Sequence, residues 1–411
     1  MYKVKIKVIP EDFRVIEKIN LSIKPQGRYS IYRLVKRNWS TLDLVDYLKR
    51  KYHLTTIRYA GLKDRYAYSV QYVSIIGNGP AEIKEENFSL HFIGKSDHPV
   101  TRDYLVGNSF HITLRDLTQD AIAQIKPVLE LTKRDGLPNY YDEQRFGSIR
   151  HGKGFFTQKL LAKHFNGALK LYIATPAAID DQKTRAVKNF LALHWGDWER
   201  LRQYTTLIQS QKTVRQFRPV LNYLTKHPND LKGALCQINR PMLELLIVAY
   251  QSFLWNEILA ELLNSLKLKL YRYPYLAGNF LFYHELPEAI RSYLAKLSIP
   301  APSPKAIFPS EKIEQITNEI LWREGLVLRD LKLPIRIRGV FFKPFDRKAL
   351  VFPERLKIKD ITEDERYPGR LKLELSFFLP KGSYATILVK RLQLATGEKL
   401  KIYPPDEINN D

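Results

Sequence analysis

Patterns typical of β-strands are confined to the two ends of this 411-residue chain, and helical patterns fill the middle. Strand-like runs occur at residues 13–19, 28–35, 56–60, 68–76, 88–93 and 109–115, and again at 335–340, 371–379 and 385–389. A chain of this length is expected to form two domains. We therefore expect an α+β fold in which residues 1–150 and 335–411 share a mixed, largely antiparallel sheet, with residues 151–334 inserted as a mainly helical domain.

Helices are expected in both parts. Ser40 and Asp43 are suitably spaced to cap a helix that carries Leu42, Val45 and Leu48 on one face. Further helical patterns lie at residues 120–133, 157–165, 183–204 and 241–266. The last of these is apolar, and we expect its core positions to be buried, namely Leu245, Val248, Leu254 and Ile258.

The first nine residues alternate apolar side chains with Lys3, Lys5 and Lys7, which predicts a half-buried strand with a lysine-lined face. This alternation differs from the continuous apolar core of a signal peptide, and no run of 18 apolar residues is present. We therefore expect a cytoplasmic protein without a membrane segment. Cys236 is the single cysteine, so an intrachain disulfide is excluded and a buried position is expected.

The net charge of +23, from 66 Lys and Arg against 43 Asp and Glu, indicates a polyanionic partner. Nucleic acid is the expected partner, because a membrane surface is disfavoured. The nine histidines lack the spacing of a metal-binding motif, so a metal enzyme has little support.

Residues 59–71 join two of the predicted strands and place Asp64 between Lys63 and Arg65. We expect Gly61 to give the turn a backbone shape closed to other residues, and the two flanking cations to keep the Asp64 carboxylate ionised. Catalytic groups often lie on such loops. An aspartate in a turn is, however, most often a structural residue that bonds to its own backbone.

A second stretch, residues 136–147, begins and ends with a glycine. It contains Asn139, Tyr140, Tyr141 and Arg145. Read alone, it is an ordinary loop whose aromatic residues belong to the core. Its alternative role is to hold RNA, because a base removed from its stack needs an aromatic face, an amide for its edge and a cation for its phosphate.

Taken together, Gly61, Lys63, Asp64, Ala67 and Gln71 resemble the signature of the TruD family of pseudouridine synthases. The loop at residues 139–147, the helical run at 249–256 and the run at 377–386 resemble further motifs of the same family. The resemblance spans the whole chain in the order of the family. It implies a pseudouridine-synthase-like core with an inserted RNA-recognition domain, and isomerisation of a uridine, expected to be uridine-13 of tRNA.

The resemblance also implies roles for individual residues. Asp64 corresponds to the catalytic nucleophile. The other implied site residues surround the target nucleotide or support the carboxylate: Lys7 as its cationic partner, Glu11 and Phe13 in a supporting motif, Lys63 beside the carboxylate, Asn139 as an amide, Tyr141 as the stacking aromatic, and Arg145 as a phosphate contact or a loop brace. Asp142 departs from the family pattern, in which glycine is common at this position.

Pseudouridine formation breaks and remakes one glycosidic bond within a single substrate, so no cofactor is expected. We expect tRNA as the partner and a monomeric enzyme. A non-catalytic RNA-binding protein would have no use for Asp64, whose charge repels phosphate. A nuclease or glycosidase would need a metal set or a second catalytic carboxylate, and the sequence suggests neither.

Overall fold

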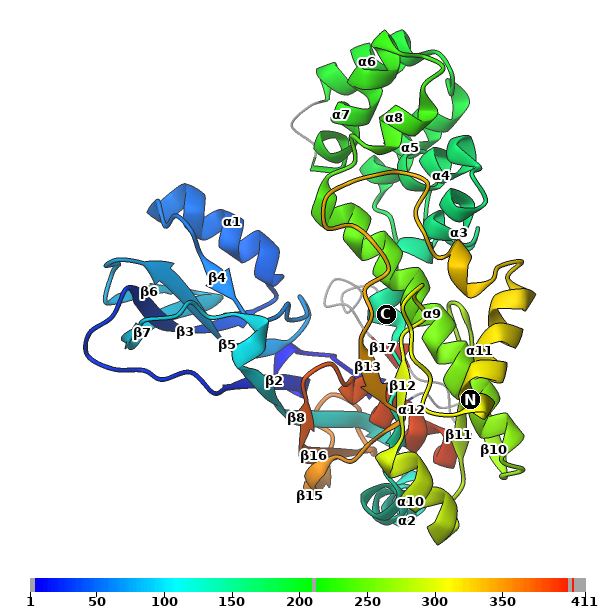
Figure 1. Ribbon diagram of the computed structural model, residues 1–411. Coiled ribbons are helices and arrows are strands. Elements are labelled where there is room, and N and C mark those ends of the chain that lie inside the picture. The colour runs from blue at the N-terminus through cyan, green and yellow to red at the C-terminus, as the bar shows by residue number, and fades with distance from the viewer. Residues whose placement is uncertain (1–3, 209–211, 398–400, 403–411) are drawn as a thin grey trace. The chain divides into compact units, whose positions relative to one another are not determined.

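The computed structural model describes residues 4–208, 212–397 and 401–402 (Figure 1). The chain divides into two compact units, one made of Met1–Asn139 with Leu350–Asp411 and the other of Tyr140–Ala349. The unit limits therefore fall at residues 139 and 349, where the sequence suggested 150 and 334.

An 11-stranded mixed sheet forms the first unit. Its main path runs in the order β15 (Glu354–Glu363), β16 (Leu371–Pro380), β8 (Leu105–Leu117), β2 (Phe13–Ile19), β5 (Tyr68–Ile76), β3 (Tyr29–Arg37), β7 (Phe88–Ser96) and β6 (Glu82–Glu85). Three short strands join it at the side, β1 (Lys5–Ile6), β17 (Lys401–Ile402) and β4 (Arg58–Tyr59). Only β2 with β5 and β1 with β17 pair in parallel among the described strands of this sheet, which confirms the predicted α+β class.

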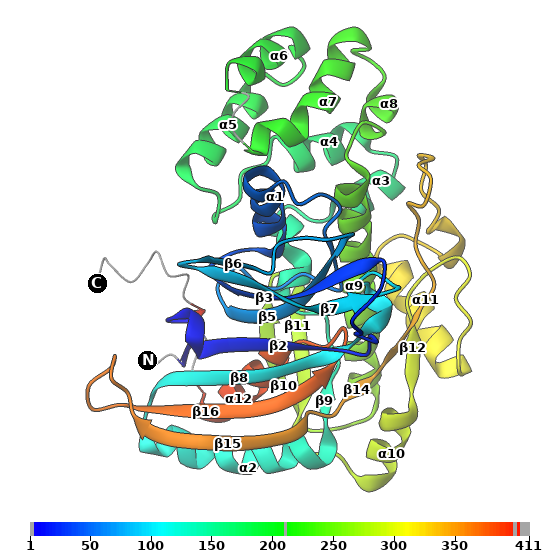
Figure 2. The same ribbon diagram turned by 90° about the vertical axis from the view of Figure 1, so that its left-hand side faces the viewer.

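Three helices of the first unit pack against apolar strand residues. The N-terminus of α1 (Thr41–Tyr52) is capped by Ser40, whose side chain accepts a hydrogen bond from the Asp43 N–H, as predicted. This helix covers the inward residues of β3 and β5, which include Leu34 and Val73. The helices α2 (Gln119–Asp135) and α12 (Ala385–Thr396) pack on Phe110, Phe377 and their neighbours, and Figure 2 shows α12 behind the strands.

The second unit is mainly helical. Its helices are α3 (Phe156–Leu161), α4 (Phe165–Ile173), α5 (Gln182–Leu193), α6 (Trp198–Leu207), α7 (Lys212–Lys226), α8 (Leu231–Leu235), α9 (Arg240–Ser265), α10 (Glu288–Lys296) and α11 (Glu311–Arg323). It also contains the hairpin β10 (Leu270–Tyr275) with β11 (Gly278–Tyr283), and the pair β12 (Ser298–Pro300) with β13 (Asp346–Lys348). The helix predicted at 157–165 ends at Leu161, the one predicted at 183–204 is two helices, and the hairpin was not predicted.

The long helix α9 forms the core of the second unit. Among the described residues, α9 is the one helix that is long and apolar enough to span a membrane. However, 67% of its most apolar window is buried inside the protein. Its polar residues bond to the loops around it: Gln251 donates to the carbonyls of Pro302 and Lys343, and the Trp255 indole donates to the Ile299 carbonyl. A core helix of this kind fixes the surrounding loops.

Several sequence expectations are wrong. Residues 385–389 begin the helix α12 instead of a strand, and residues 335–340 form turns and irregular backbone. Leu42 and Leu245 are 48% and 42% exposed, because each lies on the outer side of its helix. Cys236 is exposed and not buried.

Candidate active site

Asp64 lies in the loop formed by residues 60–67, between β4 and β5. The Lys7 ammonium nitrogen is 2.6 Å from the Asp64 Oδ2 oxygen. The Lys7 side chain is 10% exposed and the Asp64 side chain 23% exposed. The carboxylate is therefore held by a buried cation and keeps an accessible side.

Lys7 reaches this position through an unusual backbone. Its φ angle is 60°, in the left-handed region that lysine rarely adopts. The reversal interrupts the alternation that begins with Lys5, whose ammonium pairs with Asp116 at 3.2 Å. The Lys7 ammonium lies 4.2 Å from the centre of the Phe13 ring. Lys7 is thus placed in the site and does not belong to a solvated lysine face.

A second lysine, Lys36 on β3, lies beneath the loop and was not identified from the sequence. Its side chain is fully buried, and its ammonium donates to the backbone carbonyls of Asp64 at 2.8 Å and Trp39 at 2.6 Å. Burial lowers the pKa of Lys36 to about 7; the negative charge of Asp64 opposes this shift and the positive charge of Lys63 adds to it. Lys36 therefore fixes the backbone of Asp64 rather than its carboxylate.

Lys63 pairs with Glu17 and not with Asp64. Its ammonium is 2.6 Å from Glu17 Oε1, and the two side chains are 6% and 0% exposed. The other Glu17 oxygen accepts the backbone N–H of Tyr72 at 2.9 Å. The guanidinium of Arg65 lies over the Tyr66 ring, with 5.8 Å to its centre. We expected Lys63 and Arg65 to accompany the Asp64 carboxylate. The cation that contacts it is instead Lys7.

The loop is also anchored through its backbone. The Lys63 N–H donates to the Thr41 hydroxyl at 2.9 Å, and that hydroxyl donates to the Gln71 side chain at 2.9 Å. At Gly61 an added Cβ would meet only ordinary contacts, at 3.7 Å and 3.8 Å, and the backbone is not left-handed there. The predicted special role of Gly61 is wrong.

Glu11 and Phe13 follow Lys7 in the short helical turn η1 (Pro10–Asp12) and in β2. A carboxylate oxygen of Glu11 lies 3.1 Å from the guanidinium of Arg37. Phe13 is buried and packs edge-on against Phe110, with ring centres 6.1 Å apart. Glu11 is therefore a half-buried partner of Arg37, and Phe13 is the apolar support of Lys7.

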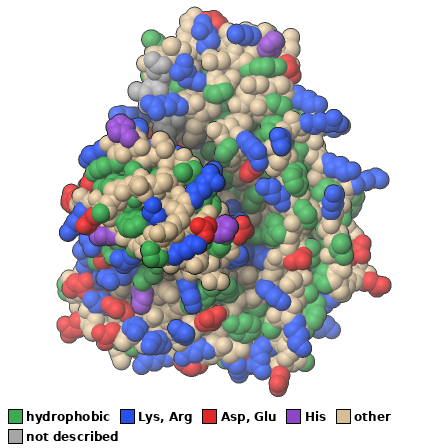
Figure 3. Space-filling model, turned by 60° about the vertical axis from the view of Figure 1, so that its left-hand side comes forward, with side chains coloured by type: hydrophobic (Ala, Val, Ile, Leu, Met, Phe, Trp, Pro, Cys, Tyr) green, Lys and Arg blue, Asp and Glu red, His purple; other side chains and the backbone are tan. Residues whose placement is uncertain are grey.

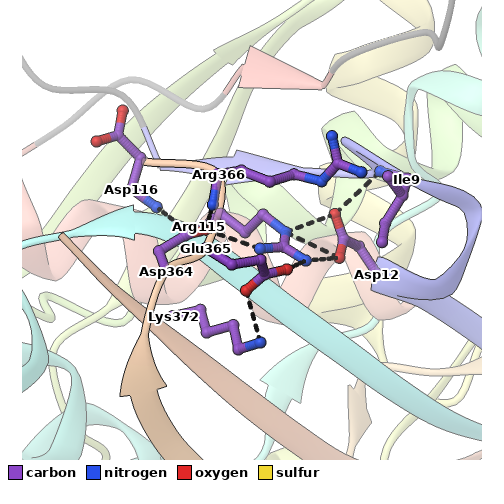
Figure 4. Close-up of polar contacts among 8 residues, drawn as sticks. All are labelled: Ile9, Asp12, Arg115, Asp116, Asp364, Glu365, Arg366 and Lys372. Carbon is purple, nitrogen blue, oxygen red and sulfur yellow. Dashed lines mark hydrogen bonds and ion pairs between the residues drawn. The ribbon is translucent and has the colours of Figure 1, made fainter. Parts of the chain in front are cut away.

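The turn that carries these residues is fixed by a buried ionic cluster centred on Arg115 of β8 (Figure 4). Its guanidinium contacts the carboxylates of Asp12, Asp364 and Glu365 at 2.8–2.9 Å. Asp12 also accepts the Ile9 N–H at 3.1 Å. Burial raises the pKa of Asp12, against the opposing effect of Arg115. No sequence motif indicated this cluster, which ties the turn to the segment after β15.

Asn139 and the residues after it lie on both sides of the unit boundary. Asn139 is buried and directly follows β9 (Leu137–Pro138), which pairs with β14 (Leu350–Val351) in the first unit. Tyr141 is a buried residue of the second unit, and its backbone exchanges two hydrogen bonds with the Asn256 side chain, at 2.9 Å and 2.8 Å. The loop backbone at Tyr141 is therefore fixed by α9.

Two cations lie near the Tyr141 ring. The guanidinium of Arg347 is 4.1 Å from the ring centre and that of Arg145 is 5.7 Å from it. The Trp255 ring packs edge-on against Tyr141 at 5.6 Å. Of the two roles considered for Arg145, this contact favours the loop brace. Asp142 is buried and precedes the turn η3 (Glu143–Ile149), where its carbonyl accepts the Arg145 N–H at 2.8 Å.

The part of the chain that the structure describes contains no group of three or more His, Cys, Asp or Glu side chains placed to hold a metal ion. The chemistry available at Asp64 is that of a single accessible carboxylate, a buried cation beside it and an aromatic ring. This set of groups suits either nucleophilic attack on a substrate carbon or removal of a proton from it.

The fold places the protein in the class of the pseudouridine synthases. Residues 2–392 match the family tRNA pseudouridine synthase D (TruD). The chain belongs to this family. It is accordingly a tRNA pseudouridine synthase, an isomerase.

Individual relatives match almost end to end. The "Probable tRNA pseudouridine synthase D 2" of Methanocaldococcus jannaschii is 35% identical over 402 residues, covering 96% of this chain and 93% of the relative. The tRNA pseudouridine synthase D of Aquifex aeolicus is 30% identical over 397 residues, covering 95% and 98%. The crystal structure of the TruD protein from Methanosarcina mazei superposes with a TM-score of 0.68 at 25% identity, covering 95% of this chain and 93% of that one.

Proposed function

We propose that this enzyme converts uridine-13 of tRNA to pseudouridine with Asp64 as the catalytic carboxylate. The observation that carries the proposal is the 2.6 Å contact of Lys7 with a carboxylate that remains partly exposed. The alternative is the same chemistry at a different uridine or in a different RNA.

In the proposed reaction the bond between uracil N1 and the ribose breaks, the uracil turns, and its C5 bonds to the ribose carbon. The proton from C5 is released, and N1 gains one. Asp64 attacks, or accepts a proton from, the sugar or the ring during this sequence. Lys7 favours the ionised carboxylate, and Lys36 fixes the backbone from which Asp64 projects.

The remaining residues hold the substrate. Asn139 and Tyr141 contact the target nucleotide, and Glu11 supports the site through Arg37. For the base to stack on the buried Tyr141 ring, it must replace the Arg347 guanidinium that lies 4.1 Å from the ring centre. The isomerisation needs no cofactor, because it exchanges no electrons and no group with a second molecule. We further propose that the enzyme acts as a monomer in the cytoplasm and without a membrane partner.

The test uses tRNA carrying tritium at uridine C5, since only formation of the new carbon–carbon bond releases this label while leaving the strand intact. The wild type is expected to release it, and Asp64→Asn to release none while binding tRNA as well or slightly better. Asp103→Asn, an exposed carboxylate with the same change, is the control. Label release by Asp64→Asn within tenfold of wild type would refute the role of Asp64. Mapping the product pseudouridine to a position other than 13 would refute the site.

A further inference from the structure

The open face of the large sheet carries an ordered row of side chains that the active site does not use. In a strand, successive side chains point to opposite faces. The helices α2 and α12 pack on the face that includes Phe13 and Phe110, so the neighbouring positions belong to the other face. Strand pairing aligns six such positions across β3, β5, β2, β8, β16 and β15, in the order Arg37, Tyr68, Arg14, His111, Ser376 and Lys357. We call these six residues the open-face row.

The row combines cations with an aromatic ring. Arg14 and Arg37 are the residues paired with Tyr68 on the two neighbouring strands. Their guanidinium carbons lie 5.6 Å and 5.4 Å from the centre of the Tyr68 ring. Arg14 and Lys357 are exposed. His111 is half-buried, and burial together with the positive charges of Lys359 and Arg14 lowers its pKa, whereas the negative charge of Glu374 opposes this shift. The centre of the row thus has two arginines around one aromatic ring.

The charges that flank the row are balanced, with three cations and three carboxylates. The cationic neighbours on the strands of the row are Lys18, Arg355 and Lys359, and the acidic ones are Glu354, Asp360 and Glu374. Together with the row itself, the cations outnumber the carboxylates. Figure 3 is turned so that the left-hand side of Figure 1 comes forward. On this side, Lys and Arg side chains are spread among hydrophobic ones.

A recess of about 270 Å³ adjoins the row at His111 and Ser376. The Phe378 ring lines it, and Lys18 lies over that ring with 5.7 Å to its centre. Gly107 leaves the room that this ring occupies, because an added Cβ would come within 2.5 Å of it. An aromatic wall, hydroxyls and a cation are the groups that hold an unstacked nucleoside.

The row starts beside the active-site loop. Lys36 points inward and bonds to the Asp64 carbonyl, while the next residue, Arg37, points to the opposite face and pairs with Glu11. A strand that bonds the catalytic loop on one face therefore carries the first cation of the row on the other. A single polyanionic chain bound at the active-site loop can therefore continue along the open-face row.

We propose that the open-face row is an accessory RNA-binding surface, which holds a phosphodiester segment of the same tRNA outside the catalytic site. Charge complementarity and the interleaved aromatic residues favour RNA over an acidic protein. The identity of the RNA rests on the proposed function. The surface contributes affinity and leaves the chemical step unchanged.

The experiment compares tRNA binding by two double variants that each remove two positive charges. Arg14→Gln/Lys357→Gln removes exposed cations of the row, and Lys126→Gln/Lys133→Gln removes exposed cations of α2, on the helix-covered side of the sheet. The dissociation constant is measured from 50 to 300 mM salt. The slope of log Kd against log salt is expected to fall by roughly 1.4–1.8 for the row variant, since each lost phosphate contact accounts for about 0.7–0.9.

The kinetic arm separates binding from chemistry. For the row variant, KM for tRNA should rise while kcat at saturating tRNA stays at the wild-type value. A row variant whose salt slope falls no further than that of the α2 variant overturns the proposal, as does a lowered kcat with unchanged KM. The wild type's own release of C5 label tests the proposed function independently, because the binding measurement needs no turnover.

Discussion

Replacing Lys36 with methionine should destabilise the first unit by an amount that grows with pH. At pH 7 the change removes two hydrogen bonds and leaves the partly buried carbonyls of Asp64 and Trp39 without this donor. An unsatisfied buried group costs about 1–3 kcal/mol, and relief from burying a charge offsets part of this. A loss of about 2 kcal/mol at pH 7 is therefore expected.

The pH dependence follows from the pKa of Lys36, which is about 7 in the folded protein against 10.5 for an ordinary lysine. Between these values the unfolded chain binds more protons than the folded one, so stability rises with pH in this window. From pH 7 to pH 9 the lysine contributes about 2 kcal/mol of additional stability to the wild type. The variant lacks this gain, so the difference between the two proteins should double over that range.

The assay is urea unfolding followed by ¹⁹F NMR of protein labelled with 5-fluorotryptophan. Trp39 is the only tryptophan in the sequence of the first unit, so its resonance reports that unit alone. Lys126→Met, at an exposed position, should show a constant difference from wild type. A Lys36→Met difference that is equal at pH 7 and pH 9 would refute the assignment of a depressed lysine pKa.

Three further predictions concern the site. Lys63→Met should lower stability by about 3–5 kcal/mol because it leaves the buried Glu17 carboxylate unpaired, and Lys63→Met/Glu17→Gln should recover most of this loss in the same unfolding assay. Tyr141→Phe should turn over like wild type, whereas Tyr141→Ala should be about five- to hundredfold slower. Because the Tyr141 ring is buried, the Ala variant should also melt at a lower temperature, so the rates are compared at a temperature where both variants are fully folded; equal rates for both variants would remove base stacking from the account. Chelators should leave turnover unchanged apart from any magnesium that the RNA needs to fold, and activity lost to a chelator and restored specifically by zinc would reveal a metal site.

Strand alternation predicted most of the first unit, because one face of its sheet is buried and the other is not. The strands at 13–19 and 68–76 have the predicted limits. The run at 385–389 was misread because α12 is buried on nearly all sides, and a helix of this kind has no 3.6-residue period to detect. The hairpin of β10 and β11 was missed because Pro274 interrupts the first of its strands.

The site was predictable where a motif marked it and not where the fold creates the contact. Lys63 and Arg65 are next to Asp64 in the sequence, but adjacent residues on a loop point in different directions, and the cation comes from Lys7, 57 residues away. Lys36 and Glu17 could have been found by strand parity, since each occupies an inward position next to buried apolar residues of its strand. Arg115 does not fit this pattern, because it directly follows the inward Leu114 and is buried where the pairing of β8 with β16 shifts register.

The ionic cluster around Arg115 has a consequence for how the protein is made. Arg115 and Asp364 are separated by 249 positions, and β16 lies between β15 and β8 in the sheet. During synthesis the turn that holds Glu11 and precedes Phe13 therefore leaves the ribosome long before its final partners. At about 5–20 residues per second, the ribosome needs roughly 12–50 s to cover this distance. Throughout this interval β8 has an unpaired edge, which makes the nascent first unit a candidate client of chaperones that shield exposed strands.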